Sequence, residues 1–165
     1  MVPGAVALTS CTDDSGGSGT TGGAKNSDGV QPAEETPSTD PAIVAALTAA
    51  ATLSTQLSLR YTALSTKFPA LRARLAAGAK YHASHLTRLK AVPGVQAVTG
   101  KAQAVPSTSA AALTDLAERE KAAAVAHAAA AAKVSGEHAR LLAMIAAAET
   151  QLAITLTPKK KADQQ

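Results

Sequence analysis

The residues of this chain best suited to chemistry are two histidines and two glutamates on the apolar faces of predicted helices. His82 and His85 lie three residues apart, and Glu120 and Glu149 fall on two later apolar stripes. Imidazole and carboxylate groups together suit zinc or iron, so one interpretation is a single divalent ion bound by all four side chains. The other is a vestigial core in which Glu120 and Glu149 pair with His82 or His85, because buried carboxylates need such partners. The sequence favours this second interpretation, since it accounts for all four residues without metal.

Other side chains that could take part in chemistry form no second constellation. His127 shares the apolar stripe of Glu120 and is expected to be a core histidine, while Tyr61 and Tyr81 are expected to pack rather than to hydrogen-bond the histidines. No nucleophile and base stand at a recognisable spacing, and no glycine-rich loop follows a predicted strand. The sequence therefore favours a non-enzymatic protein without a cofactor. Enzymatic activity stays open, with iron or zinc as the alternative cofactor.

Four helical stretches position these residues. Asp40 followed by Pro41 is a strong helix start signal, and apolar residues then recur at three- and four-residue steps as far as Leu64. A second helix follows Pro69 and stops at Val92-Pro93-Gly94. The third is expected to be capped by Ser109, and the fourth by Ser135 after a break at Ser135-Gly136.

The lengths of the connections predict how the helices are arranged. Short breaks make the first and second helices, and the third and fourth, antiparallel neighbours. The connection 91–108 can span up to about 60 Å when extended, enough to cross the length of a bundle. Residues 41–157 are therefore predicted to form an all-α four-helix bundle of two antiparallel hairpins joined by a long crossover. No stretch approaches 18 uncharged apolar residues, so no membrane-spanning helix is expected.

Charge is distributed unevenly along the chain. Residues 12–40 carry six acids and one lysine among Gly, Ser and Thr, which predicts a flexible, disordered acidic linker, and 158–165 is expected to be a basic disordered tail. From residue 41 to 114 there is no acid but eight basic residues, so the first hairpin can face anionic lipid or an acidic envelope polymer, or simply solvent. Aromatic residues are only 2% of the chain, too few for a stacking platform, so nucleic acid is not an expected partner. The basic residues are Arg60, Lys67, Arg72, Arg74, Lys80, Arg88, Lys90 and Lys101.

The only cysteine, Cys11, ends the segment Leu8-Thr9-Ser10-Cys11 and is followed by the polar linker. This segment resembles the lipobox of bacterial lipoproteins, which implies that Cys11 is acylated and that the protein is anchored to the extracytoplasmic face of the cell membrane. Residues 1–11 would then be the remnant of a truncated signal, because they lack the basic region and the full apolar stretch of about 7–15 residues. If Met1 is the true start, lipidation fails and the protein is cytoplasmic. The other interpretation of Cys11 is a lone cysteine beside a disordered segment.

Several short stretches carry a second resemblance. They are Arg60–Leu64 leading to Phe68–Leu71, then Tyr81–Leu86, Leu116–Glu120, Ser135–Leu142 and Ala148-Glu149. Together they resemble the ferritin-like domains of actinobacterial lipoproteins over residues 41–157. That family implies a ferritin-like bundle with a di-iron site made from a Glu on each of two helices and a Glu-x-x-His on each of the other two.

This chain departs from the ferritin-like metal pattern. The second helix has His82-Ala83-Ser84-His85 where Glu-x-x-His is expected, and the fourth has Glu149-Thr150-Gln151-Leu152. The first helix has no carboxylate between Ser54 and Gln56. The resemblance therefore implies a degenerate site.

These observations predict a membrane-tethered, ferritin-like module that binds a protein partner or an anionic envelope component. The alternative is a metal-binding or redox protein with a reduced site at His82, His85, Glu120 and Glu149. A third class is a purely structural spacer. Neither the partner nor the oligomeric state, a homodimer included, follows from the sequence.

Overall fold

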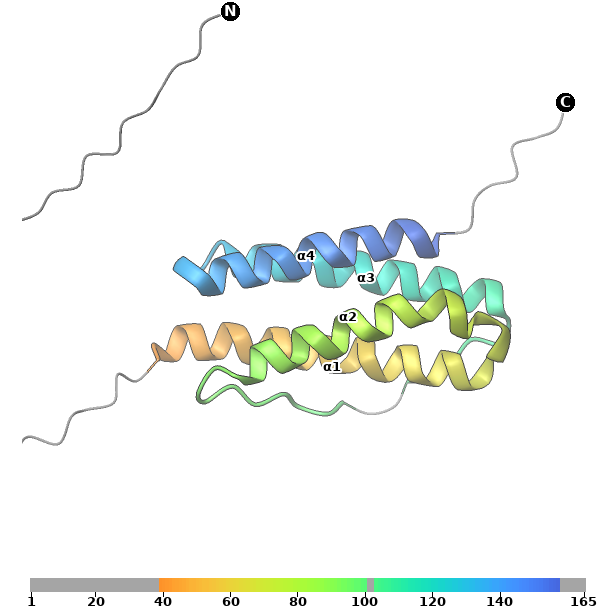
Figure 1. Cartoon of the computed structure of the whole chain (residues 1–165), viewed down its shortest axis with the longest axis horizontal. Helices are drawn as coiled ribbons and strands as arrows, with labels where there is room; N and C mark the ends of the chain where they lie inside the picture. Colours follow the sequence, from red (N-terminus) through yellow and green to blue (C-terminus); the bar gives the residue numbers. More distant parts are fainter. Residues whose placement is uncertain (1–38, 101–102, 158–165) are drawn as a thin grey trace, which may run out of the picture. The chain divides into compact units, whose positions relative to one another are not determined.

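The computed structural model describes residues 39–100 and 103–157. Within them the chain forms helices α1 (Pro41–Lys67), α2 (Arg72–Lys90), α3 (Ser109–Ala131) and α4 (Gly136–Leu156), with a short 3-10 turn η1 (Pro69–Leu71) and no strand (Figure 1). The predicted all-α bundle of four helices is confirmed. The predicted lipobox at Cys11, almost all of the linker 12–40, Lys101 and the tail 158–165 lie outside the described residues.

The helix starts follow capping chemistry. Asp40 accepts a hydrogen bond from the backbone N–H of Ala42 at 2.8 Å, so the predicted start of α1 is confirmed. The expectation that Ser109 caps α3 is wrong, because Ser109 already lies in the helix. The cap is Thr108, which has extended backbone and accepts from Ala111 N–H at 3.2 Å. Ser135 occupies the cap position of α4, although its side chain makes no capping hydrogen bond.

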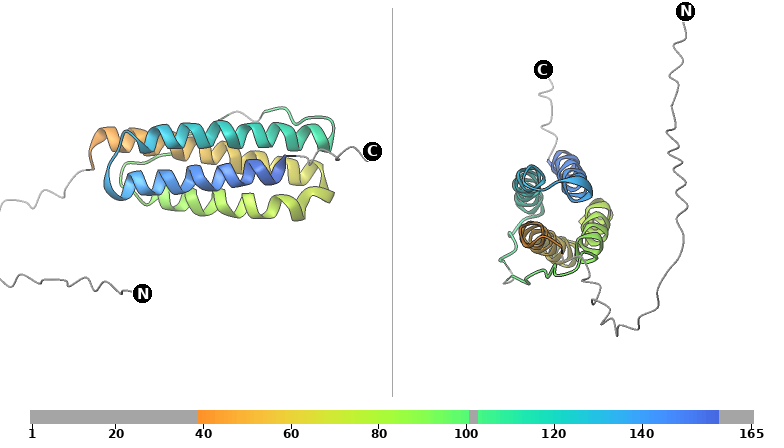
Figure 2. Two further views of the ribbon diagram at one scale, coloured as in Figure 1. Left: turned by 90° about the horizontal axis from the view of Figure 1, so that it is seen from above. Right: turned by 90° about the vertical axis from the view of Figure 1, so that its left-hand side faces the viewer.

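The connection 91–108 runs lengthwise along α1. Val98 N–H donates to Thr52 Oγ1 at 3.1 Å, and further on Lys67 Nζ donates to the carbonyl of Val105 at 3.1 Å. Later residues of the connection thus meet later turns of α1, and the chain enters α3 at the end of the bundle where α1 gives way to α2 (Figure 1). The four helices surround one shared interior (Figure 2).

Two hydrophobic clusters fill this interior. One contains Tyr61, Leu75, Leu116 and Leu156, and the other contains Leu47, Ala51, Leu89, Leu142 and Ile145. On every helix a buried polar residue falls between residues of the first cluster and residues that belong to the second cluster or pack against it. These residues are Ser54 on α1, His82 on α2, His127 on α3 and Glu149 on α4.

Two helices, α1 and α4, are long and apolar enough to cross a membrane by length and composition, contrary to the expectation drawn from uncharged runs. Both also line the bundle interior, where Arg60 of α1 and Glu149 of α4 are buried. Length and composition do not distinguish a spanning helix from a core helix of a bundle.

Candidate functional site

The candidate site is a buried polar layer to which all four helices contribute. Its side chains are at most 7% exposed, in a bundle whose other buried residues are almost all apolar. All four expected ligands belong to it, as does His127, the predicted core histidine, which is 1% exposed. The layer consists of Ser54, His82, His85, Glu120, His127 and Glu149.

Glu120 on α3 is held by two other helices. Its Oε1 accepts from the hydroxyl of Tyr61 on α1 at 2.7 Å and lies within hydrogen-bond distance of His82 Nε2 on α2, at 2.8 Å. The expected pairing of Glu120 with a histidine of α2 is confirmed. Tyr61 does more than pack, because its hydroxyl completes this bond; burial, reinforced by Glu120, raises the pKa of Tyr61 far above its usual range and keeps it a donor.

Glu149 on α4 has a different partner from the one expected. Its Oε2 lies 2.7 Å from Nδ1 of His127 on α3, while Nε2 of the same ring lies 3.4 Å from the carbonyl of Ala50. The expectation that Glu149 pairs with His82 or His85 is therefore wrong. The reason is that α3 and α4 form the most closely packed hairpin, which brings His127 to Glu149. Burial raises the pKa of Glu149 although His127 opposes the shift.

His85 belongs to the layer but hydrogen-bonds neither glutamate in the described structure. Its ring lies 6.5 Å from that of His82 and 6.0 Å from that of Tyr81, which is 51% exposed. Burial lowers the pKa of His85, and the neighbouring His82, His127 and Arg88 lower it further. His85 is therefore neutral at neutral pH.

Five buried polar atoms in residues 39–100 and 103–157 have no hydrogen-bond partner. Four of them belong to the expected ligands, one atom on each residue. Leaving such a group unpaired costs about 1–3 kcal/mol, so each of these atoms would gain from a further hydrogen-bond or metal partner. The five atoms are Ser54 Oγ, His82 Nδ1, His85 Nδ1, Glu120 Oε2 and Glu149 Oε1.

The donor set decides which metal centre the layer could hold. Two imidazoles and two carboxylates suit one zinc or iron ion. A di-iron centre does not fit, because α1 offers Ser54 where a carboxylate is needed. In the part of the chain that the structure describes, no three His, Cys, Asp or Glu side chains stand in a group that could hold a metal ion, so binding would require the side chains to rearrange.

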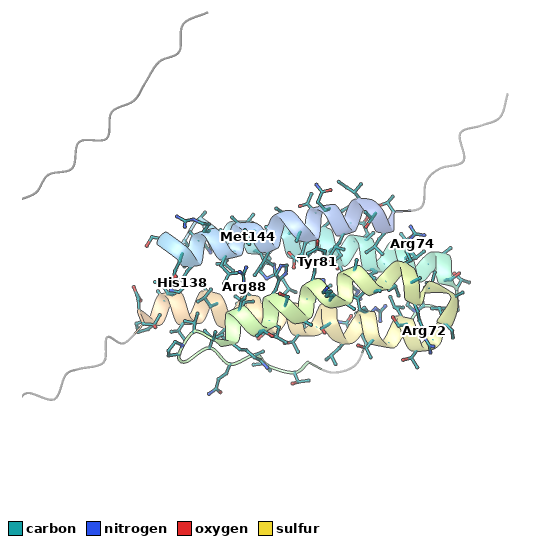
Figure 3. All side chains as sticks on the ribbon, viewed as in Figure 1. Arg72, Arg74, Tyr81, Arg88, His138 and Met144 are labelled. Carbon is teal, nitrogen blue, oxygen red and sulfur yellow. The ribbon has the colours of Figure 1, made fainter. Side chains whose placement is uncertain are left out.

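A second candidate surface is the solvent side of α2. This helix exposes five basic side chains and carries no acid. Arg72, Arg74 and Arg88 are spread along this helix (Figure 3). Among the described residues none of the five forms an ion pair, while Arg72 and Arg74 donate to backbone carbonyls. Arg60, counted above with the basic residues, is instead buried and paired with Asp115 at 2.7 Å. The exposed five are Arg72, Arg74, Lys80, Arg88 and Lys90.

No protein-family model, curated protein or solved structure matches the chain. Its function is therefore argued from the residues and the geometry above.

Proposed function

We propose that this protein is a membrane-tethered, ferritin-like module without enzymatic activity, which binds an anionic component of the cell envelope through the exposed side of α2. The lipobox-like segment at Cys11 supports a lipid anchor on the extracytoplasmic face of the cell membrane. Two helical hairpins joined by a connection that follows α1 support the ferritin-like assignment, since that class has one long crossover.

The observation that carries the binding proposal is that none of the five exposed cations of α2 forms an ion pair with another described residue. Five exposed cations without acids on one helix create a positive potential, and each contributes about 1 kcal/mol near an anionic membrane surface. An anchored protein is held close to such a surface. Because the cations are exposed, their attraction is screened by salt.

The buried layer supports a structural role for its glutamates. Glu120 holds α1, α2 and α3 together through Tyr61 and His82, and Glu149 joins α4 to His127. These bonds give each buried carboxyl group a partner in the interior, where an unpaired one would be costly. This structural role of the two glutamates is compatible with a module that has no enzymatic activity.

Vesicle flotation tests the proposal. The full chain without its lipid should float with phosphatidylglycerol-containing vesicles, not with pure phosphatidylcholine, and high salt should release it. A variant with Arg72, Lys80 and Lys90 changed to Gln should lose binding. A control of equal charge, with Lys121, Lys133 and Arg140 changed to Gln, should retain it. Equal loss in both variants would show that net charge suffices, and no flotation at all would turn the search to a protein partner or a structural spacer.

A second function is favoured by the buried polar atoms that have no hydrogen-bond partner among the described residues. His82 Nδ1, His85 Nδ1, Glu120 Oε2 and Glu149 Oε1 are the donors that one zinc or iron ion would take. As a metal-binding or redox protein, the chain would use these four residues in the bundle core. The metal-loading experiment in the Discussion separates this function from the first.

A further inference from the structure

A cavity of about 680 Å³ lies between α1, α3 and the connection that follows α1. Its volume is in the range of small-molecule sites, about 300–1,000 Å³. No residue of the buried glutamate–histidine layer lines it, and neither does any of the five exposed cations of α2. It is therefore separate from both functions considered above.

The walls of the cavity are mainly apolar. Leu53, Leu57, Leu59 and Ala63 line it from α1, and Ala122 lines it from α3. Leu59 is 47% exposed, so part of this apolar wall is open to solvent. Such walls suit a hydrocarbon chain.

One side of the cavity carries positive charge. Arg60 and Arg119 both line it, and both donate to the same oxygen of Asp115, at 2.7 Å and 2.9 Å. Burial alone would raise the pKa of Asp115, but Arg119 and Arg60 together lower it, so this carboxylate stays ionised. Two guanidinium groups facing one carboxylate leave one net positive charge. The next carboxylate along α3, Glu118, is paired with Lys121.

The two arginines differ in what they can still bind. Arg60 is 6% exposed and uses Nε and Nη2 on Asp115 and Nη1 on the carbonyls of Gln103 and Ala104. Arg119 donates only from Nε in the described structure, and its side chain is 37% exposed. Its two terminal nitrogens can therefore bind a carboxylate in the two-pronged geometry that guanidinium groups favour.

We propose that this cavity binds a long-chain fatty acid, with the carboxylate on Arg119 and the hydrocarbon chain against Leu53, Leu57 and Leu59. The net positive charge beside Asp115 complements the head group, and the leucine wall complements the chain. This goes beyond the proposed function, because it needs neither the α2 surface nor a metal ion.

Displacement of a fluorescent fatty acid tests the proposal. The full chain, which has no tryptophan to interfere, is titrated with dansyl-labelled undecanoic acid, and palmitate or hexadecanol is added as competitor. Arg119→Gln should weaken palmitate about tenfold and leave hexadecanol unchanged, because it removes only a charge-assisted bond. Ala122→Phe should weaken both competitors by filling the cavity. Ala128→Phe, on another side of α3, should change neither.

Several results would overturn the inference. One is the absence of saturable binding to the wild-type chain. Another is equal affinity for palmitate and hexadecanol, which would exclude recognition of the carboxylate. Wild-type affinity in both Arg119→Gln and Ala122→Phe would place the ligand elsewhere. Circular dichroism of each variant establishes that a loss of binding is not a loss of fold.

Discussion

The phenol ring of Tyr61 on α1 lies against the backbone of Gly78 on α2, in the space that a β-carbon at residue 78 would occupy. This close approach lets α1 and α2 pack with the whole ring between them, and Tyr61 is fully buried. From there its hydroxyl reaches Glu120 on α3 at 2.7 Å. The absence of one side chain on α2 therefore positions a hydrogen bond between α1 and α3.

Replacing Gly78 by Ala should destabilise the bundle by about 3 kcal/mol, from overpacking and from weakening of the Tyr61–Glu120 bond. The measurement is the free energy of unfolding in denaturant. In a Tyr61→Leu background the same substitution should cost less than about 1 kcal/mol, since the obstructing ring is gone and Ala favours helix. Strictly additive effects of the two substitutions would contradict the packing described here.

The free energy of unfolding of Glu149→Gln should increase relative to that of the wild type as the pH rises above about 4.5. Burial raises the pKa of Glu149 above its ordinary value of 4.5, so the unfolded chain releases this proton before the folded one does. Wild-type stability therefore falls as the pH rises through this window, and a Gln, which does not titrate, removes that loss. Unfolding free energies at several pH values test this. Glu137→Gln, at a residue whose side chain is 86% exposed, is the control and should show no such trend.

His85 should contribute to the loss of folding stability at acidic pH. Its pKa lies below the ordinary value of 6.5, so the unfolded chain binds a proton first as the pH falls, and stability is lost below about pH 6.5. His85→Gln should lose less stability than the wild type between pH 7 and 5, as measured by thermal unfolding. His138→Gln, which replaces a histidine outside the buried layer, should follow the wild-type curve. Identical curves for His85→Gln and the wild type would refute this role.

Asp115→Asn should cost about 2 kcal/mol, because it leaves the buried guanidinium of Arg60 without its anionic partner. Hydrogen exchange should also rise in the connection near Gln103 and Ala104, whose carbonyls Arg60 holds. The matched control is Glu118→Gln, which breaks an exposed ion pair with Lys121 and should cost less than about 1 kcal/mol. Equal costs would mean that Arg60 does not depend on Asp115.

Metal loading separates the two proposed functions. The full chain is incubated with zinc or ferrous iron, desalted and measured by elemental mass spectrometry. Near-stoichiometric metal that is lost in the His82→Ala/Glu149→Ala variant, but kept in His138→Ala/Glu137→Ala, would establish the metal-binding function. If the wild type also holds no metal, the interpretation of the layer as a vestigial core without metal stands. The α2 surface would then be the site to test next.

The sequence by itself determined the helices and the buried face of each. Asp40-Pro41 and Pro69 mark helix starts through local backbone chemistry, and the recurrence of apolar residues every three or four positions placed His82, Glu120 and Glu149 inside. These features depend on neighbours along the chain, so they can be read without a structure.

Only the tertiary structure decided which buried groups meet. Glu149 pairs with His127 rather than with a histidine of α2, and Tyr61 hydrogen-bonds Glu120, which is 59 residues away in the sequence. Arg60 is buried in an ion pair with Asp115 and does not belong to the exposed basic surface. The cavity beside Arg119 likewise forms only where the connection 91–108 passes α1 and α3. Helical periodicity determines the face on which a side chain lies, but the partner depends on the axial register and the spacing of neighbouring helices, which are set by packing between segments far apart in the chain.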